Sequence, residues 1–205
     1  FRATGNEPMV LYFGDCDNNG DTDAILTSFT DGVSYPFISR DDLLAQLPSL
    51  KKQFPDYASY ANATTKTLLT YLPSVQSDTI NELRSGYLDH HADGWTFVPF
   101  PQSAQVAPVF SITEVPGSIN KGNRFLLTGN ASKTRVKIGE IDANHGVLLE
   151  RAGGDWRQVP DSGLWIRGDV RSSAEIQAGS VKKLVIGRNG LPLMVYDIVN
   201  PAAIQ

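Results

Sequence analysis

The sequence predicts a mainly β protein built from repeated four-stranded antiparallel units, with a helical insertion at about residues 39–73. Three observations support this prediction. Short apolar runs bounded by Gly, Asn, Asp and Pro recur through most of the chain, which is typical of short strands joined by turns. Two pairs of segments repeat at a nearly constant spacing, and the apolar residues between 39 and 73 follow the period of a helix.

Composition and charge narrow the class of protein. The chain has 205 residues, of which 41% are hydrophobic and 20% charged, as in folded water-soluble proteins. The net charge of −4 and the lack of a basic patch predict that nucleic acid is not a partner. No apolar run approaches the roughly 20 residues of a transmembrane helix, so we expect no membrane span. The chain opens at Phe1 without a signal peptide, and we expect a mature or trimmed chain.

The first elements are predicted to be strands. Residues 9–13 and 23–29 each carry the apolar pattern of a strand, and the polar loop between them predicts a hairpin-like connection. Thr30-Asp31-Gly32 is a turn signal, and we expect a further short strand within residues 33–38.

From Ser39 the apolar period changes to that of a helix. Ser39 with Asp42 resembles a capping box. The apolar residues that follow at helical spacing, with a break or restart at Pro48, are Leu43, Leu44, Leu47 and Leu50. Asp56 is expected to cap a second helix that ends at Pro73. The residues that share one face of this helix are Tyr57, Tyr60, Ala61, Thr64, Leu68, Tyr71 and Leu72.

The strand pattern returns at about Glu82 and continues to the end of the chain. The predicted strands centre on residues 87–88, 96–98, 109–112, 125–127, 146–149, 165–166, 184–186 and 193–196. Many short strands at this spacing predict an all-β sandwich, barrel or propeller.

An internal repeat favours the propeller among these. Residues 87–99 align with 147–160, and residues 123–130 align with 182–189, at an offset of about 60 residues. The second pair also aligns, more loosely, with residues 22–29. A recurring unit of about four short strands is typical of a propeller blade. We therefore expect a partial β-propeller whose first unit carries the helical insertion.

We expect the whole chain, residues 1–205, to form one partial propeller. Its predicted parts are strands with a polar loop at 1–38, the helical insertion at 39–73, a blade at 74–135 and a C-terminal blade at 136–205. Closed propellers have about four to eight blades, more than this chain provides. Its open blade faces then need a cover, from the helical insertion or through self-association with a second chain.

The polar loop between the first two strands predicts a metal site. Oxygen-bearing side chains stand at every second position: Asp15, Asp17, Asn19, Asp21 and Asp23. Calcium takes six to eight oxygen ligands in a flexible cage, and Gly20 allows the sharp turn that folds the ligands back. We expect Asp21 to contribute its backbone carbonyl while its carboxylate faces solvent. A metal-free turn rich in Asp and Asn is the alternative.

Two further features define this site. An EF-hand requires Glu at the twelfth loop position, where this chain has Leu26, so an EF-hand is excluded. The corresponding loops of later units, 116–123 and 175–182, have lost the acidic pattern. We therefore predict one calcium ion with a structural role. Cys16, the only cysteine, is expected to be a small apolar residue that points into the core.

The segment from Phe13 to Asp23 resembles the FG-GAP repeat, also called the VCBS-type repeat. That family forms integrin-like β-propellers with a calcium loop of pattern D-x-D-x-[DN]-G-x-x-D, and it usually has Phe, Val or Leu where this chain has Cys16. The whole chain is similar to the C-terminal portion of large bacterial surface proteins of this type. The resemblance implies an extracellular, cell-surface or periplasmic location.

Other candidate sites have simpler interpretations. His90 and His91 are expected on a surface hairpin and His145 in a turn. Trp95, Trp156 and Trp165 are expected to pack blades together, with a sugar-binding platform as the alternative.

The sequence predicts no catalytic residues, because it lacks G-x-S-x-G, H-E-x-x-H and Walker motifs and calcium accounts for its densest carboxylate cluster. We expect a non-catalytic, calcium-stabilised propeller module that binds a protein or glycan partner. The alternative is the non-catalytic part of a propeller-type enzyme that degrades polysaccharides.

Overall fold

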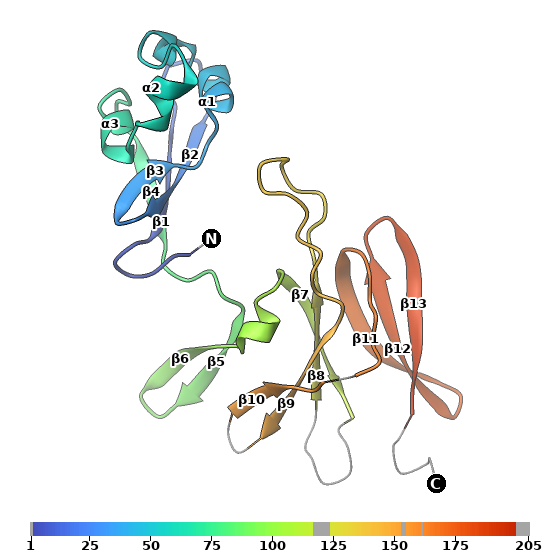
Figure 1. Ribbon diagram of the computed structural model, residues 1–205. Coiled ribbons are helices and arrows are strands. Elements are labelled where there is room, and N and C mark those ends of the chain that lie inside the picture. The colour runs from blue at the N-terminus through green and yellow to red at the C-terminus, as the bar shows by residue number, and fades with distance from the viewer. Residues whose placement is uncertain (1, 117–123, 153–154, 161, 200–205) are drawn as a thin grey trace. The chain divides into compact units, whose positions relative to one another are not determined.

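The computed structural model describes residues 2–116, 124–152, 155–160 and 162–199, and it confirms a mainly β protein (Figure 1). The chain divides into two compact units, Phe1–Leu83 and Arg84–Gln205. We refer to them as unit 1 and unit 2 and describe each by itself.

Unit 1 contains one antiparallel sheet. Its strands, in spatial order, are β3 (Val33–Pro36), β2 (Asp23–Thr30), β1 (Met9–Gly14) and β4 (Gln76–Ile80). The strands predicted at 9–13, 23–29 and 33–38 are confirmed. β4 was not predicted, because all five of its residues are exposed and it shows no apolar alternation. It pairs with β1 through the backbone, with Leu11 opposite Asp78.

The helical insertion lies between β3 and β4. It consists of α1 (Arg40–Gln46), the 3-10 helix η1 (Pro48–Lys52), α2 (Tyr57–Ala61) and α3 (Thr65–Leu69). The predicted caps are confirmed: the side chain of Ser39 accepts from the N–H of Asp42, and that of Asp56 accepts from the N–H of Ser59.

The prediction of one continuous helix from Asp56 to Pro73 is wrong. The chain forms two short helices, because Asn62 ends α2 and the side chain of Thr64 caps α3 by accepting from the N–H of Thr67. Thr64 prefers to cap, since its hydroxyl competes with the helical hydrogen bonds of the backbone.

The core of unit 1 lies between the sheet and these helices. Its buried residues are Ile25, Ile38, Leu43, Leu44, Leu47, Leu50, Phe54, Ala63, Leu68 and Leu72. Cys16, Tyr60, Leu69 and Val75 pack against it and are partly buried. Cys16, which lies in the metal loop, thus connects the loop to this core.

The described residues of unit 2 form three antiparallel sheets and a short 3-10 helix, η2 (Gln102–Ala104). The first sheet is the hairpin β5 (Gly86–His91) and β6 (Gly94–Pro99). The second has the order β10 (Asp155–Gln158), β9 (Val147–Ala152), β8 (Arg124–Gly129), β7 (Val109–Val115). The third contains β11 (Val170–Ala178), β12 (Val181–Arg188) and β13 (Leu191–Ile198).

The four-stranded sheet of unit 2 is apolar on both faces. Successive side chains along a strand point to opposite faces, so consecutive residues of β8 belong to two different apolar clusters. Leu127 joins Leu149, Phe100 and Ala104, next to Tyr87 of the hairpin. Leu126 joins a second cluster with Leu148, Ile166, Val170, Leu184 and Ile186, which includes β11 and β12 of the third sheet. The hairpin and the third sheet therefore pack against opposite faces.

The predicted repeat has a structural counterpart in unit 2. Residues 87–99 and 147–160 both contain hairpins, β5–β6 and β9–β10, and residues 123–130 and 182–189 contain β8 and β12. The sheets do not follow the predicted boundaries, however. β4 belongs to the sheet of unit 1, and the four-stranded sheet crosses residue 135 because β8 pairs with β9.

The loop 116–123 lies almost entirely outside the described residues, and 175–182 forms the end of β11, a turn and the start of β12. Within the described ranges, none of the sheets closes into a barrel or a propeller. None of the helices in that part of the chain has the length and apolar character needed to cross a bilayer.

Candidate metal centre

The loop predicted to hold calcium connects two neighbouring strands. β1 ends at Gly14 and β2 begins at Asp23, and these residues face each other in the antiparallel ladder. The ladder therefore holds the two ends of the loop together. Between them, Asn18 and Gly20 have positive φ angles of 59° and 92°, a conformation that glycine adopts freely and asparagine tolerates.

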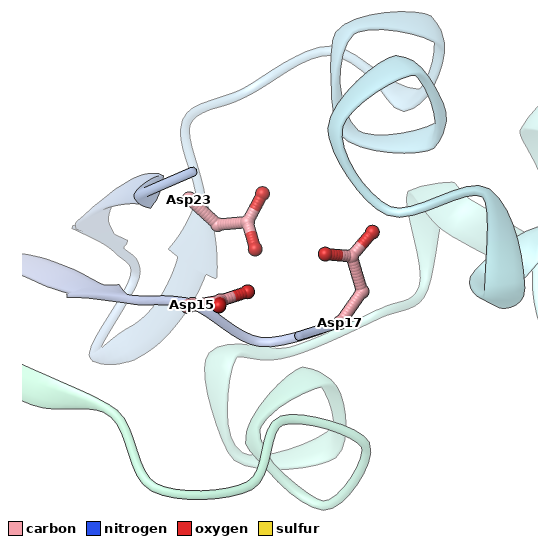
Figure 2. A group of neighbouring side chains, drawn as sticks. All are labelled: Asp15, Asp17 and Asp23. Carbon is pink, nitrogen blue, oxygen red and sulfur yellow. The ribbon is translucent and has the colours of Figure 1, made fainter. Parts of the chain in front are cut away.

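Three carboxylates converge in this loop. Side-chain oxygens of Asp15, Asp17 and Asp23 lie within 4.8 Å of one another, and Figure 2 shows the three groups pointing toward a common centre. Asp23 is buried, Asp17 half-buried and Asp15 exposed. Like charges this close repel one another, and burial of Asp23 reduces the screening of that repulsion by water.

Backbone N–H groups hold these carboxylates in place. Asp23 accepts from the N–H of Cys16 at 3.0 Å, and Asp15 accepts from the N–H groups of Asn19 and Gly20, each at 3.0 Å. The N–H of Asn19 also lies 3.2 Å from an oxygen of Asp17. Each carboxylate is thus oriented by the loop, and the acidic residues do not simply extend into solvent.

The other two predicted ligands occupy different positions. The side-chain oxygen of Asn19 accepts from the N–H of Asp21 at 2.7 Å. Asp21 is exposed and does not belong to the group of converging carboxylates. The structure therefore brings together three of the five predicted residues through their carboxylates. That Asp21 contributes its backbone carbonyl stays a prediction.

Cys16 is half-buried against the core of unit 1, as predicted. Burial raises the pKa of its thiol, and the negative charges of Asp23, Asp15 and Asp17 raise it further. The thiol of Cys16 donates to the carbonyl oxygen of Gly14, with Sγ 3.7 Å from that oxygen, and it is not one of the three converging side chains. This leaves an all-oxygen donor set, which suits a hard cation such as Ca²⁺ better than a transition metal.

The other histidines and carboxylates that the structure describes form no comparable site. Among the described residues, Asp15, Asp17 and Asp23 are the one group of three or more His, Cys, Asp or Glu side chains close enough to share an ion. His90 and His91 lie on the β5–β6 hairpin, as predicted. The ring of His90 contacts that of Trp95, with centroids 4.5 Å apart, and Nε2 of His91 lies 3.8 Å from Asp89.

The three tryptophans occupy two kinds of environment. Trp156 packs edge-to-face against Tyr87, Phe100 and Phe125, as predicted for a packing residue. Trp95 and Trp165 instead are 66% and 56% exposed, so the packing prediction is wrong for them.

Trp165 stacks on His145, with ring centroids 4.1 Å apart. Spacing along the chain could not predict this pair, because hairpin β9–β10 separates the two residues.

Comparison of the chain with models of protein families, with curated proteins and with solved structures gave no significant match.

Proposed function

We propose that this chain is a calcium-stabilised, non-catalytic β-propeller module of the FG-GAP type, part of an exported or surface protein that binds a protein or glycan partner. The observation that carries the proposal is the convergence of Asp15, Asp17 and Asp23 between two neighbouring strands. The residues belong to the segment Phe13–Asp23, which resembles the FG-GAP calcium loop.

A calcium ion would remove the electrostatic conflict of the loop. The three carboxylates repel one another without a cation, and a divalent ion turns that repulsion into attraction. Asn19, through its amide oxygen, and Asp21, through its backbone carbonyl, would supply further oxygen ligands of the kind calcium accepts. Because binding requires the folded hairpin, the ion would stabilise unit 1.

The propeller part of the proposal is supported by the sheets of unit 2. A hairpin, a four-stranded sheet and a three-stranded sheet follow one another and pack face to face through two apolar clusters. Stacked antiparallel sheets of this size are the building principle of propellers.

The outer strand β13 also exposes Leu191, Leu193 and Val195. In a larger propeller, such a strand would pack on a further blade or on a second copy of the chain.

The calcium site is tested by calorimetric melting after chelation and after addition of calcium. We expect saturating calcium to raise the unfolding temperature of unit 1, since a ligand at about 100 times its Kd adds about 2.7 kcal/mol. Asp17→Asn is expected to abolish most of this gain. Asp21→Asn is the matched control, because it removes the same charge from the same loop but lies outside the carboxylate group.

Two results would contradict the calcium site. One is an unfolding temperature that calcium does not change. The other is an equal loss of calcium stabilisation in Asp17→Asn and Asp21→Asn, which would show a general effect of loop charge.

A further inference from the structure

An open pocket of about 630 Å³ lies in unit 2 beside the Trp165–His145 stack. It is formed by the end of β10, the turn before β9 and the segment 162–165, together with residues near η2. Its volume falls within the range typical of small-ligand sites, about 300–1,000 Å³. Its polar and aromatic lining side chains are His145, Trp165, Ser103, Gln158 and Ser162.

Trp165 presents a large aromatic surface at this pocket. Its side chain is 56% exposed, whereas the next residue, Ile166, is fully buried. An exposed indole does not contribute to a core in the way Trp156 does. It is nevertheless held in position, because its ring stacks on the imidazole of His145 with an interplanar angle of 24°. The guanidinium carbon of Arg167 lies 5.5 Å from the indole centroid and adds hydrogen-bond donors near the ring.

The stack is fixed by the backbone beneath it. Nδ1 of His145 lies 3.2 Å from the carbonyl oxygen of Ile166. A carbonyl oxygen only accepts, so the tautomer with its proton on Nδ1 donates a hydrogen bond here. The N–H of Ile166 donates in return to the carbonyl oxygen of His145 at 3.0 Å. These two contacts join the segments that carry the two stacked rings.

A buried network supports the same turn. The N–H of Asn144 donates to the side-chain oxygen of Asn130 at 2.9 Å, and the side-chain oxygen of Asn144 accepts from Gly146 at 2.9 Å. Both asparagines are fully buried. Gly146 has a φ of 99°, and a Cβ there would lie 2.9 Å from Ile166. The aromatic surface is therefore preorganised, which lowers the entropic cost of binding.

The polar groups around the pocket match a neutral sugar. Ser103, Gln158 and Ser162 can each donate and accept hydrogen bonds, as sugar hydroxyls can. Apart from His145, none of the described lining side chains ionises. Arg167 is the cation beside the Trp165 ring, and it is not one of the residues that line the pocket. The net charge of −4 opposes polyanions in general.

We propose that this pocket is a binding subsite for a neutral pyranose oligosaccharide. The apolar C–H face of one sugar ring would lie against the exposed part of the Trp165 indole, which the stacked His145 ring does not cover, and its hydroxyls would contact Gln158 and the two serines. This inference rests on the proposed binding role and specifies its partner as a glycan.

The test measures binding of soluble, chemically defined hexasaccharides by calorimetry and by tryptophan fluorescence. The probes are cellohexaose, laminarihexaose, xylohexaose and mannohexaose. We expect at least one of them to bind at micromolar to millimolar concentration, and Trp165→Ala to weaken that binding at least about tenfold. Trp95→Ala is the matched control, because Trp95 is also exposed and in contact with a histidine ring but does not line the pocket.

A second variant guards against a folding defect in Trp165→Ala. Gln158→Leu keeps the size of the side chain and removes its hydrogen bonds, and we expect it to weaken binding about threefold or more while the far-ultraviolet circular dichroism stays unchanged. The proposal is overturned if no hexasaccharide binds, or if Trp95→Ala and Trp165→Ala lose affinity equally.

Failure of this inference can be distinguished from failure of the proposed calcium site. Calcium stabilisation is measured as the unfolding temperature of unit 1, whereas sugar binding is measured at the pocket of unit 2. The sugar titration is carried out both with calcium and with a chelator. Sugar binding that depends on Trp165 in both conditions supports the subsite even if calcium does not stabilise unit 1.

Discussion

Ser111 on β7 and Ser173 on β11 connect two sheets of unit 2. Their hydroxyl oxygens lie 2.8 Å apart, and the backbone N–H of Ser173 donates to the hydroxyl oxygen of Ser111 at 2.9 Å. The hydroxyl of Thr113 adds a hydrogen bond to the carbonyl oxygen of Ser173 at 3.1 Å. Because β7 and β11 each pair with another strand of their own sheet, these contacts fix how one sheet lies along the other.

Replacing Ser111 tests this connection. Ser111→Ala removes the acceptor of the Ser173 N–H, and we expect the free energy of unfolding of unit 2 to fall by about 1–3 kcal/mol. Urea unfolding followed by tryptophan fluorescence reports on unit 2 alone, because Trp95, Trp156 and Trp165 all lie within it. Ser180→Ala, in the exposed turn after β11, is the control. Equal losses in the two variants would contradict a specific role for Ser111.

Asn130 combines an unusual backbone conformation with buried hydrogen bonds. Its φ is 87°, and its side-chain nitrogen donates to the carbonyl oxygens of Asn144 and Gly168 at 2.9 and 3.2 Å. Asn130→Gly keeps the backbone conformation but loses the hydrogen bonds, and it should cost about 1–3 kcal/mol. Asn130→Ala should cost about 1–2 kcal/mol more, because alanine disfavours positive φ.

The same urea titration separates these two contributions. A loss near zero in Asn130→Gly would show that the buried network adds no stability. Equal losses in the glycine and alanine variants would show that the backbone conformation carries no penalty.

Thr64 is the residue that divides the helical insertion. Its side chain accepts from the N–H of Thr67 at 3.2 Å. Thr64→Ala should lower the free energy of unfolding of unit 1 by about 1 kcal/mol, as is typical for loss of an N-cap. Thr64→Ser keeps the hydroxyl and should lose less than half of that. Calorimetric melting measures both, and a serine variant as unstable as the alanine variant would argue against capping.

Tyr60 predicts how unit 1 responds to alkaline pH. Burial raises the pKa of its hydroxyl from 10.0 to about 12, and the hydroxyl donates to the carbonyl oxygen of Ile38 at 2.8 Å. Between these two pH values the unfolded chain releases this proton before the folded one does. The contribution of Tyr60 to stability is therefore complete below pH 10 and is lost as pH rises through 12.

Tyr60→Phe isolates this effect from that of the other tyrosines. The variant should lose stability less steeply than the wild type over the same alkaline range, as measured by urea unfolding. In an absorbance titration, the wild type should also show one more tyrosine with a raised pKa than the variant does. Parallel stability curves for the two proteins would contradict the assignment.

Much of the local structure could be predicted from the sequence. The caps at Ser39 and Asp56 follow from side-chain chemistry close in the chain, and the hairpins follow from apolar runs separated by turn residues. β4 could not be predicted, because its five residues are exposed and only backbone pairing with β1 makes them a strand. Such pairing leaves no periodic signal in the sequence.

The two candidate sites also differed in how well the sequence could predict them. The carboxylates of Asp15, Asp17 and Asp23 belong to one short loop, so their spacing was enough to predict that they converge. Trp165 and His145 meet only because Ile166 is paired with His145 across a folded turn. Contacts that depend on tertiary structure in this way lie outside the reach of sequence spacing.

The position of β4 also has a consequence for the order of folding. β1, β2 and β3 pair with their neighbours in the chain, whereas β4 reaches β1 only after the entire helical insertion. Closing that long loop costs entropy before any backbone bond to β4 forms. Helices that form early shorten the effective loop, so their caps should speed the final pairing step. The helical insertion separates β3 from β4 in the sequence, and its early folding would bring β4 close to β1.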